Sequence, residues 1–94
     1  MLQEDVPNYL TQVPGWEIVE DGKKITRDFT FKNFKEALKF INDVSAIAER
    51  EGHHPNLDLH EYKYVRITNY THAIGGLHEN DFILAAKINE LITN

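Results

Sequence analysis

The feature that most constrains the fold is a helical stretch whose beginning and end are both marked in the sequence. Asn33 is a favoured N-cap residue, and apolar residues recur at helical spacing after it. Gly52 stands where a left-handed C-terminal cap is expected, and Pro55 prevents the helix from resuming. We therefore predict a helix between Asn33 and Gly52. Its expected buried stripe is Phe34, Ala37, Leu38, Ile41, Val44, Ser45 and Ala48.

Alternation of apolar and polar residues on both sides of this helix predicts four strands. Before the helix, Asp21-Gly22 is a two-residue turn signal between two alternating stretches, so the first two strands are expected to form a hairpin. After the helix, Val65 and Ile67 alternate with polar and aromatic residues. The expected strands cover residues 16–20, 24–31, 57–59 and 62–71. The second of them is expected to carry Ile25, Arg27, Phe29 and Phe31 on one side.

Two further helices are expected near the ends of the chain. Residues 3–13 carry apolar residues at helical spacing, which predicts a short helix beginning near Pro7. Gly75-Gly76 interrupts the chain before a last amphipathic helix over residues 79–93. The apolar side of that helix is expected to be Phe82, Ala85, Ile88, Leu91 and Ile92.

The order of these elements, ββαββα after a short N-terminal helix, predicts an α+β fold. We expect a two-layer sandwich in which a four-stranded antiparallel sheet carries the helices on one face. The other face is then only partly covered, with Tyr64 and Tyr70 exposed, and the strand edges need protection. Self-association provides that protection, so we expect a homo-oligomer, either a dimer or a tetramer.

The composition limits the classes of protein to which the chain can belong. Its 94 residues, without a linker or repeat, predict a single domain over residues 1–94 with a modest core. The absence of cysteine excludes disulfides and thiol chemistry, and favours an intracellular, cytoplasmic protein, with import into an organelle left open. A net charge of −5 disfavours direct binding of nucleic acid or of an anionic membrane. No apolar run is long enough for a membrane span.

Five histidines are many for so short a chain, and three of them stand where predicted elements end. His53 and His54 follow the long helix, His72 follows the last strand, and Asp81 lies at the beginning of the last helix. A single histidine at such a place more often interacts with a helix end than acts in catalysis. Together, however, imidazoles with an unperturbed pKa of about 6.5 and a carboxylate suit proton transfer near neutral pH.

Other kinds of site fit the sequence less well. Zinc binding is disfavoured because the adjacent histidines lack the i, i+4 spacing of a helical ligand pair. Ser45, the single serine, lies in mid-helix and not in a nucleophile turn, and Gly75-Gly76 lacks the lysine of a phosphate-binding loop. We assign structural roles to His60 and His78. What remains is a metal-free site suited to elimination or isomerisation of a small polar molecule.

The residues around this set resemble the signature of the pterin-4a-carbinolamine dehydratases, a family that includes the dimerisation cofactor of a homeodomain factor. The agreement lies in several separately placed positions that occur in the family's order, which is more specific than a His-His-Pro run alone. The likeness extends from Pro14-Gly15-Trp16 to the last helix, about four-fifths of the chain. The matching positions are Glu49, His53, His54, Pro55, Tyr62, His72 and Asp81.

The resemblance implies a two-layer α+β fold and the dehydration of 4a-hydroxytetrahydrobiopterin to quinonoid dihydrobiopterin, in tetrahydrobiopterin recycling, without a metal or organic cofactor. It implies that His53 and His54 carry out the proton transfers interchangeably, and that His72 hydrogen-bonds the substrate and stabilises its developing positive charge. Asp81 would orient an imidazole, and Glu49 would support the site. The expected contacts of the pterin are Leu57, Asp58, Leu59, Thr71, His72 and Ala73.

Two positions depart from the family's pattern. Leu57 stands where many animal members have a tryptophan, and His78 stands where Ser or Thr usually caps the last helix. A lost cap is expected to cost about 1 kcal/mol. Residues 71–82 are closer to non-animal members, which bears against a role with a transcription factor. Two alternatives remain: an interaction protein or transcriptional coactivator of the same fold, and a pterin-binding protein without turnover.

Overall fold

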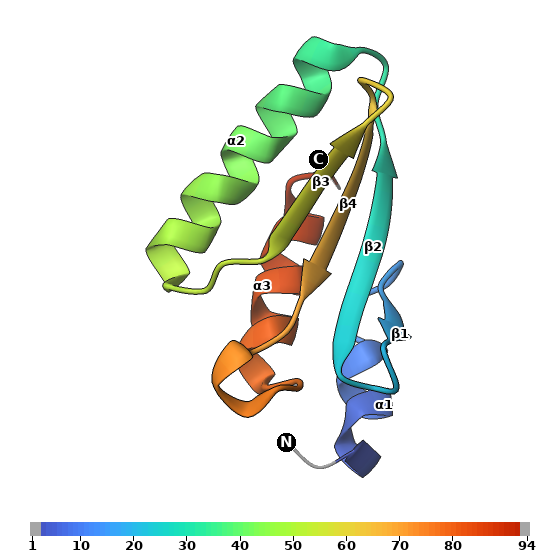
Figure 1. The fold of residues 1–94 in the computed structure, drawn as a ribbon, viewed down its shortest axis with the longest axis vertical. Helices are drawn as coiled ribbons and strands as arrows, with labels where there is room; N and C mark the ends of the chain where they lie inside the picture. Colours follow the sequence, from blue (N-terminus) through green and yellow to red (C-terminus); the bar gives the residue numbers. More distant parts are fainter. Residues whose placement is uncertain (1–2, 93–94) are drawn as a thin grey trace.

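A four-stranded antiparallel sheet and a layer of helices form the molecule, as the sequence predicts (Figure 1). The computed structural model describes residues 3–92. Within this part of the chain, no helix is both long and apolar enough to cross a membrane. The elements in chain order are the 3₁₀ helix η1 (Gln3–Asp5), α1 (Val6–Leu10), β1 (Glu17–Val19), β2 (Lys24–Thr30), α2 (Phe34–Glu51), β3 (Asn56–His60), β4 (Tyr64–Asn69), the 3₁₀ helix η2 (His72–Ile74) and α3 (Glu79–Glu90).

The order of the strands across the sheet is β1-β2-β4-β3, so β2 and β4 are central and the other two are edges. Asn56 pairs with Thr68, which places the beginning of β3 beside the end of β4. Helix α2 ends just before β3, and α3 begins soon after β4. Four element ends therefore meet at one end of the sheet, where the candidate site lies.

The predicted hairpin turn is confirmed; β1, β2 and β4 are shorter than predicted, and β3 is longer. Asp21 and Gly22 have φ values of 55° and 83°, and the amide of Lys23 donates to the carbonyl of Glu20 at 3.1 Å. Such positive φ values at both central residues are typical of the turns that match the twist of a hairpin. Strand β4 begins at Tyr64 and not at residue 62, because residues 61–63 form the turn after β3.

Both ends of α2 are where the sequence predicts them. The side chain of Asn33 accepts a 2.9 Å hydrogen bond from the amide of Glu36, which satisfies a donor that the first turn leaves free. Gly52 adopts the left-handed conformation, with φ 65°, and its amide donates back into the helix. This reversal sends the chain directly from α2 into the loop that carries His53.

The buried face of α2 differs from the predicted stripe. Phe34, Leu38 and Ser45 are exposed, whereas Phe40 and Ile47 are buried. The aromatic residues of the sheet account for the difference: the ring of Phe40 lies 4.7 Å from that of Phe29 and 4.8 Å from that of Phe31, measured between centroids. The face that the helix buries is Ala37, Phe40, Val44, Ile47 and Ala48.

Helix α3 buries two polar residues beside its apolar ones. Phe82, Leu84, Ala85 and Ile88 belong to the core, as do Val6 and Val13 from the N-terminal segment. Asp81 and Asn89 are also buried on this helix. Leu91 is partly buried and Ile92 exposed, so the predicted apolar side extends too far. The predicted end at residue 93 lies outside the described residues.

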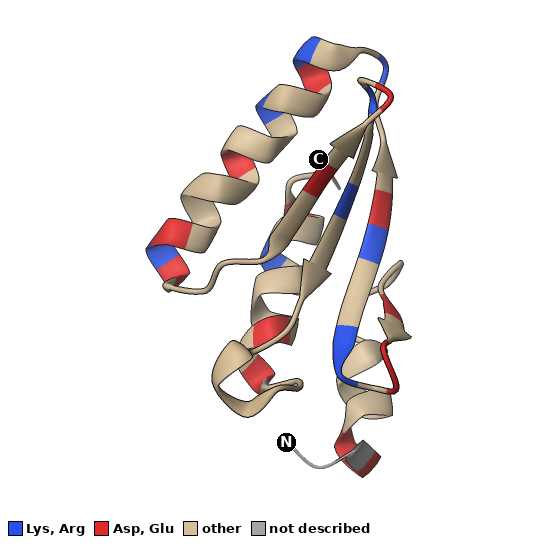
Figure 2. Ribbon diagram, in the orientation of Figure 1, with Lys and Arg blue, Asp and Glu red and all other residues tan. Residues whose placement is uncertain are grey.

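The open face of the sheet is polar, so the expectation of apolar exposure on it is wrong. Arg66 donates two hydrogen bonds to the Asp28 carboxylate across the central strands, at 2.7 and 3.1 Å. Tyr64 is half-buried, and its ring stacks on that of His60 at 5.5 Å. Acidic and basic residues are interspersed along the strands and α2 and are not separated by sign (Figure 2). This face therefore offers no apolar reason for self-association.

Candidate active site

The site is built around Asp81, a fully buried residue in the first turn of α3. One carboxylate oxygen, Oδ1, lies 2.5 Å from Nε2 of His53. The other, Oδ2, accepts hydrogen bonds from the hydroxyl of Thr71 at 3.0 Å and from the amide of His78 at 2.8 Å. The side-chain amide of Asn69 donates to the carbonyl oxygen of Asp81 at 3.1 Å. Both carboxylate oxygens and the backbone of Asp81 are thus held in place.

The His53 ring points into the protein, with 15% of its side chain exposed. Its backbone is fixed by the end of α2, since its amide donates to the carbonyl of Ala48 at 3.1 Å. An ionised carboxylate only accepts hydrogen bonds, so with Asp81 ionised this contact requires the ring proton on Nε2. In neutral His53, Nδ1 then carries the lone pair and is the nitrogen that can take a proton.

His54 lies next to His53 but in a different environment. Its Nε2 lies 3.0 Å from Oε1 of Glu49, and the two side chains are 64% and 78% exposed. Water screens a pair as exposed as this one, so it contributes little to stability. The two adjacent histidines therefore differ: one ring is held by a buried carboxylate, and the other is exposed to solvent with an exposed partner.

His72 is the first residue of η2, and its contacts are separate from those of His53 and His54 in the described part of the chain. Its ring packs against Tyr70, with centroids 4.3 Å apart. Paired backbone groups of Thr71 and Gly76 close the loop around it, through a 2.8 Å hydrogen bond. Within residues 3–92, no hydrogen bond connects His72 to His53 or His54. The side chain of His72 is exposed and available to a ligand.

The three expected contact residues of β3 do not share one surface. Leu57 and Leu59 pair with Ile67 and Val65 of β4, on the face that the helices cover. Asp58 pairs with Arg66 and projects from the opposite face, because successive side chains of a strand alternate. The carboxylate of Asp58 is thus directed away from Asp81. Of the remaining expected contacts, Ala73 is exposed in η2 and Thr71 is bound to Asp81.

His78 caps α3, so the expected loss of a cap is wrong. Its Nδ1 accepts a hydrogen bond from the amide of Asn80 at 3.2 Å, while its own amide donates to Asp81. An imidazole nitrogen here takes the part that a hydroxyl usually plays. His60, the other histidine given a structural role, stacks on Tyr64 on the open sheet face.

Asn69 is a residue of the site that the sequence analysis missed. Its side chain is fully buried at the end of β4, and its Oδ1 has no hydrogen-bond partner among residues 3–92. The signal was present in the alternation of β4, where Asn69 occupies the same phase as Val65 and Ile67. A polar residue in a buried phase indicates a specific partner inside the protein.

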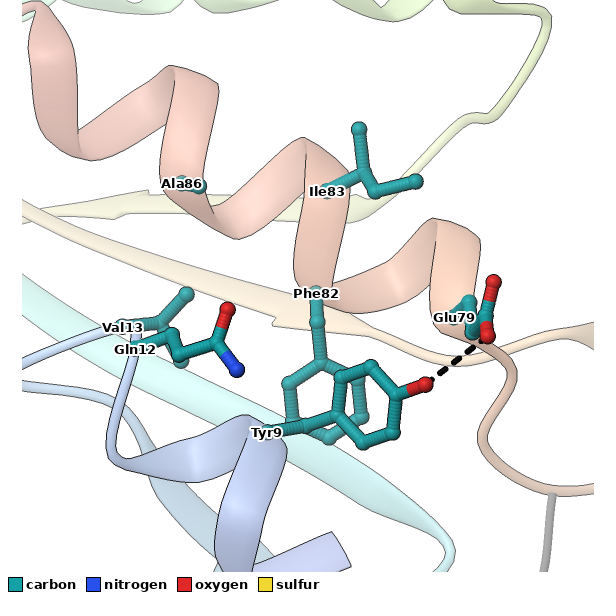
Figure 3. A pocket seen from close by; sticks show the side chains of 7 residues that line it. All are labelled: Tyr9, Gln12, Val13, Glu79, Phe82, Ile83 and Ala86. Carbon is teal, nitrogen blue, oxygen red and sulfur yellow. Dashed lines mark hydrogen bonds between the residues drawn. The ribbon is translucent and has the colours of Figure 1, made fainter.

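An apolar hollow of about 330 Å³ lies between α1 and α3, and no histidine is among the residues that line it (Figure 3). The ring of Tyr9 lies over that of Phe82, and its hydroxyl donates to Glu79 at 2.8 Å. This hydrogen bond to a carboxylate raises the pKa of Tyr9. The hollow is lined by one carboxylate, which the Tyr9 hydroxyl engages, and by no imidazole, so it lacks the imidazole–carboxylate pairing found around Asp81. In the described part of the chain, no three His, Asp or Glu side chains are grouped as metal ligands.

Fold and site together define a small α+β protein with imidazole–carboxylate pairs at one end of its sheet. The family model for pterin 4 alpha carbinolamine dehydratase matches residues 1–91, and the chain belongs to that family. Pterin-4-alpha-carbinolamine dehydratase 2, mitochondrial, of Arabidopsis thaliana is 48% identical over 93 residues, which are 97% of this chain and 50% of that protein. A Methylococcus capsulatus protein that bears the family's name provisionally is 47% identical over 91 residues, 97% of this chain and 79% of that one.

Two solved structures show the same fold. A transcriptional coactivator/pterin dehydratase from Brucella melitensis superposes with a TM-score of 0.89 and is 32% identical, over 97% of this chain and 96% of that one. A pterin dehydratase-like protein identified as a RuBisCO assembly factor in the alpha-carboxysome superposes with a TM-score of 0.72 and 21% identity, over 88% and 95% of the two chains. At that identity the second likeness concerns the fold alone.

Proposed function

We propose that the protein dehydrates 4a-hydroxytetrahydrobiopterin to quinonoid dihydrobiopterin and water, and so takes part in the recycling of tetrahydrobiopterin. The observation that carries the proposal is the contact between His53 and the buried Asp81, beside His54, in a chain of the pterin 4 alpha carbinolamine dehydratase family. Imidazoles titrate near neutral pH, which is the property that an acid and a base of this reaction need.

The reaction breaks the bond between C4a and its hydroxyl oxygen. The leaving oxygen takes up one proton and departs as water, while the lone pair of N5 forms a double bond to C4a. N5 then releases its own proton, so that the atoms and charges of substrate, product and water balance. One proton donor and one proton acceptor suffice, and the step is redox-neutral. We therefore assign the protein no metal and no organic cofactor.

His53 and His54 are the proposed proton carriers, and their roles are interchangeable in the proposal. The Nδ1 lone pair of His53 suits it to accept a proton, because Asp81 engages Nε2. His54, exposed and paired with Glu49, can exchange protons with solvent between turnovers. A well-placed general acid or base contributes about 10²–10⁴-fold to the rate.

The substrate would lie between these histidines and η2. His72 is the proposed hydrogen-bonding partner of the pterin and stabilises its developing positive charge, and Ala73 is proposed to contact it. Leu57 is exposed near the beginning of β3 and, with Leu59, offers an apolar surface to the ring. The register of β3 bears against a contact with Asp58. The Thr71 hydroxyl is bound to Asp81, which bears against a contact between that hydroxyl and the substrate.

The test is to produce 4a-hydroxytetrahydrobiopterin with an aromatic amino acid hydroxylase and to follow the quinonoid product by ultraviolet absorbance. Wild type should accelerate its formation over buffer, and His53→Ala should lower kcat about 10²-fold or more. His54→Ala and His72→Ala are measured in the same way. His60→Ala is the matched control, since it removes an imidazole from the open face and should leave kcat unchanged.

The same assay separates the alternative functions. A wild-type protein that binds a reduced pterin without accelerating dehydration would be a binding protein. A protein that does neither would favour an interaction role, for which the coactivator in the name of the Brucella structure provides the precedent. Variants as fast as wild type would refute the assigned roles while leaving the activity intact.

We further propose a homo-oligomer, a dimer or tetramer, that binds neither nucleic acid directly nor a membrane. The free edge of β3 and the exposed Phe34 and Leu38 of α2 support self-association better than the open sheet face does. A monomeric mass in light scattering at micromolar concentration would refute it. We propose a cytoplasmic location, and the mitochondrial name of the Arabidopsis relative keeps import into an organelle open.

A further inference from the structure

Thr71 has contacts that differ from the substrate contact expected of it, and they lead inward to Asp81. We propose that Thr71 is a positioning residue, which orients the Asp81 carboxylate and thereby keeps the proton of His53 on Nε2. Its effect on turnover rests on the proposed dehydratase function. Its effect on the His53 ring does not, because the three groups are in contact in the protein without substrate.

The single hydroxyl proton of Thr71 is committed to Asp81. It is donated to Oδ2 over 3.0 Å, so it is not free for a ligand at the same time. Thr71 also precedes η2, where a threonine often caps with its side chain, yet it makes no such cap. Its hydroxyl therefore serves neither its own helix nor the exposed surface.

Two donors on the same oxygen determine how the carboxylate is turned. Oδ2 accepts from Thr71 and from the amide of His78, which leaves Oδ1 directed at His53. Asn69, two residues before Thr71 on the same side of the chain, holds the carbonyl of Asp81. Without the Thr71 hydroxyl, one donor would remain on Oδ2, and the carboxylate would be freer to rotate away from the ring.

The orientation of the carboxylate decides which nitrogen of His53 is basic. A carboxylate opposite Nε2 favours the tautomer with the proton on that nitrogen and the lone pair on Nδ1. Loss of that orientation would allow the other tautomer, in which Nδ1 carries the proton and is no base. In a catalytic triad, a histidine held in the wrong tautomer lowers kcat about 10⁴-fold. Loss of the Thr71 hydroxyl removes only part of the orientation, so we expect kcat to fall about tenfold.

The experiment compares Thr71→Val, Thr71→Ala and Thr71→Ser with wild type, using long-range ¹H–¹⁵N NMR of the histidine rings without substrate and kcat and KM with it. Wild type and Thr71→Ser should show His53 protonated on Nε2 and should have similar kcat. Thr71→Val and Thr71→Ala should show a mixture of tautomers and a kcat lowered about tenfold, with KM within about twofold. Thr68→Val is the control, because its hydroxyl meets the hydroxyl of Thr26 on the open face.

Each outcome is decisive for the positioning role. If the His53 ring of wild type carries its proton on Nδ1 and none on Nε2, the inference is overturned. This result needs wild type alone, so it holds even if a variant does not fold. An unchanged tautomer in Thr71→Val with a raised KM overturns it in favour of a substrate contact. The expected shift of tautomer in a protein without dehydratase activity supports the positioning role and refutes the proposed function instead.

Discussion

The guanidinium of Arg27 on β2 and the side-chain amide of Asn89 on α3 are in direct contact: Nη1 donates a 2.7 Å hydrogen bond to Oδ1. The same oxygen accepts a hydrogen bond from the indole nitrogen of Trp16 at 2.9 Å. The amide nitrogen of Asn89 donates to the carbonyl of Pro14 at 3.0 Å. One buried amide thus joins the sheet, the last helix and the segment before β1. Burial around this cluster lowers the pKa of Arg27.

Asn89→Ala is expected to lower the free energy of unfolding by about 2–3 kcal/mol, because the buried indole N–H loses its acceptor and the guanidinium keeps only the carbonyl of Pro14. Urea denaturation followed by tryptophan fluorescence measures the change. Asn42→Ala, at an exposed position of α2, is the control and should change stability by about 0.5 kcal/mol or less. Equal stability of Asn89→Ala and wild type would show that the cluster does not stabilise the fold.

Phe40→Ala should destabilise the protein by about 3–5 kcal/mol, since it removes a buried ring packed on Phe29 and Phe31. Phe34→Ala removes the same side chain from a position that is 50% exposed. It should lower the unfolding free energy of a single chain by about 0.5 kcal/mol or less. Thermal unfolding by circular dichroism compares the two. A larger loss of stability for Phe34→Ala than for Phe40→Ala would instead support the buried face that the sequence predicts for this helix.

His78→Ala should cost about 1 kcal/mol of stability, because the amide of Asn80 loses its acceptor at the beginning of α3. His78→Ser supplies a hydroxyl acceptor in the same place and should restore most of the loss. Both variants keep the amide of residue 78 that donates to Asp81. Urea titrations test the pair, and an alanine variant as stable as wild type would mean that the imidazole does not act as a cap.

The stability that the Asp28–Arg66 pair provides should be lost in acid. The hydrogen bonds from Arg66 hold the pKa of Asp28 below its usual range. A carboxyl group whose pKa is lower in the folded protein stabilises it above the unfolded pKa of about 3.9, and the contribution disappears as the pH falls through the folded value. The difference in unfolding free energy between wild type and Asp28→Asn should therefore be constant near neutral pH and shrink below about pH 4. The pair is exposed, so the difference is small, and growth of the difference on acidification would contradict the assignment.

The parts of the fold that local chemistry determines could be predicted from the sequence. Asn33 and Gly52 end α2 through contacts within the helix itself, and Asp21-Gly22 turns the hairpin through its own backbone. The rotation of α2 about its axis could not be predicted in this way. It depends on where Phe40 meets Phe29 of β2 and Phe31 just after that strand, which is a property of the assembled layers.

The candidate site could likewise be predicted from the sequence only in part. The order of His53, His54, His72 and Asp81 identifies the family, whereas the partner of each imidazole depends on how the chain leaves Gly52 and enters α3. Sequence spacing alone gave no reason to pair His53 with Asp81 and His54 with Glu49. Asn69 could have been found from its phase in β4, but the inward direction of the Thr71 hydroxyl could not.

Asp81 draws its partners from the loop after α2, from the end of β4, from the residue before η2 and from the residue before α3. The arrangement around Asp81 needs all of these segments at once. The proposed activity therefore depends on them cooperatively, like the folding transition of a small protein. On gradual heating or in rising denaturant, activity should disappear together with the native structure, and no partly folded form should retain it.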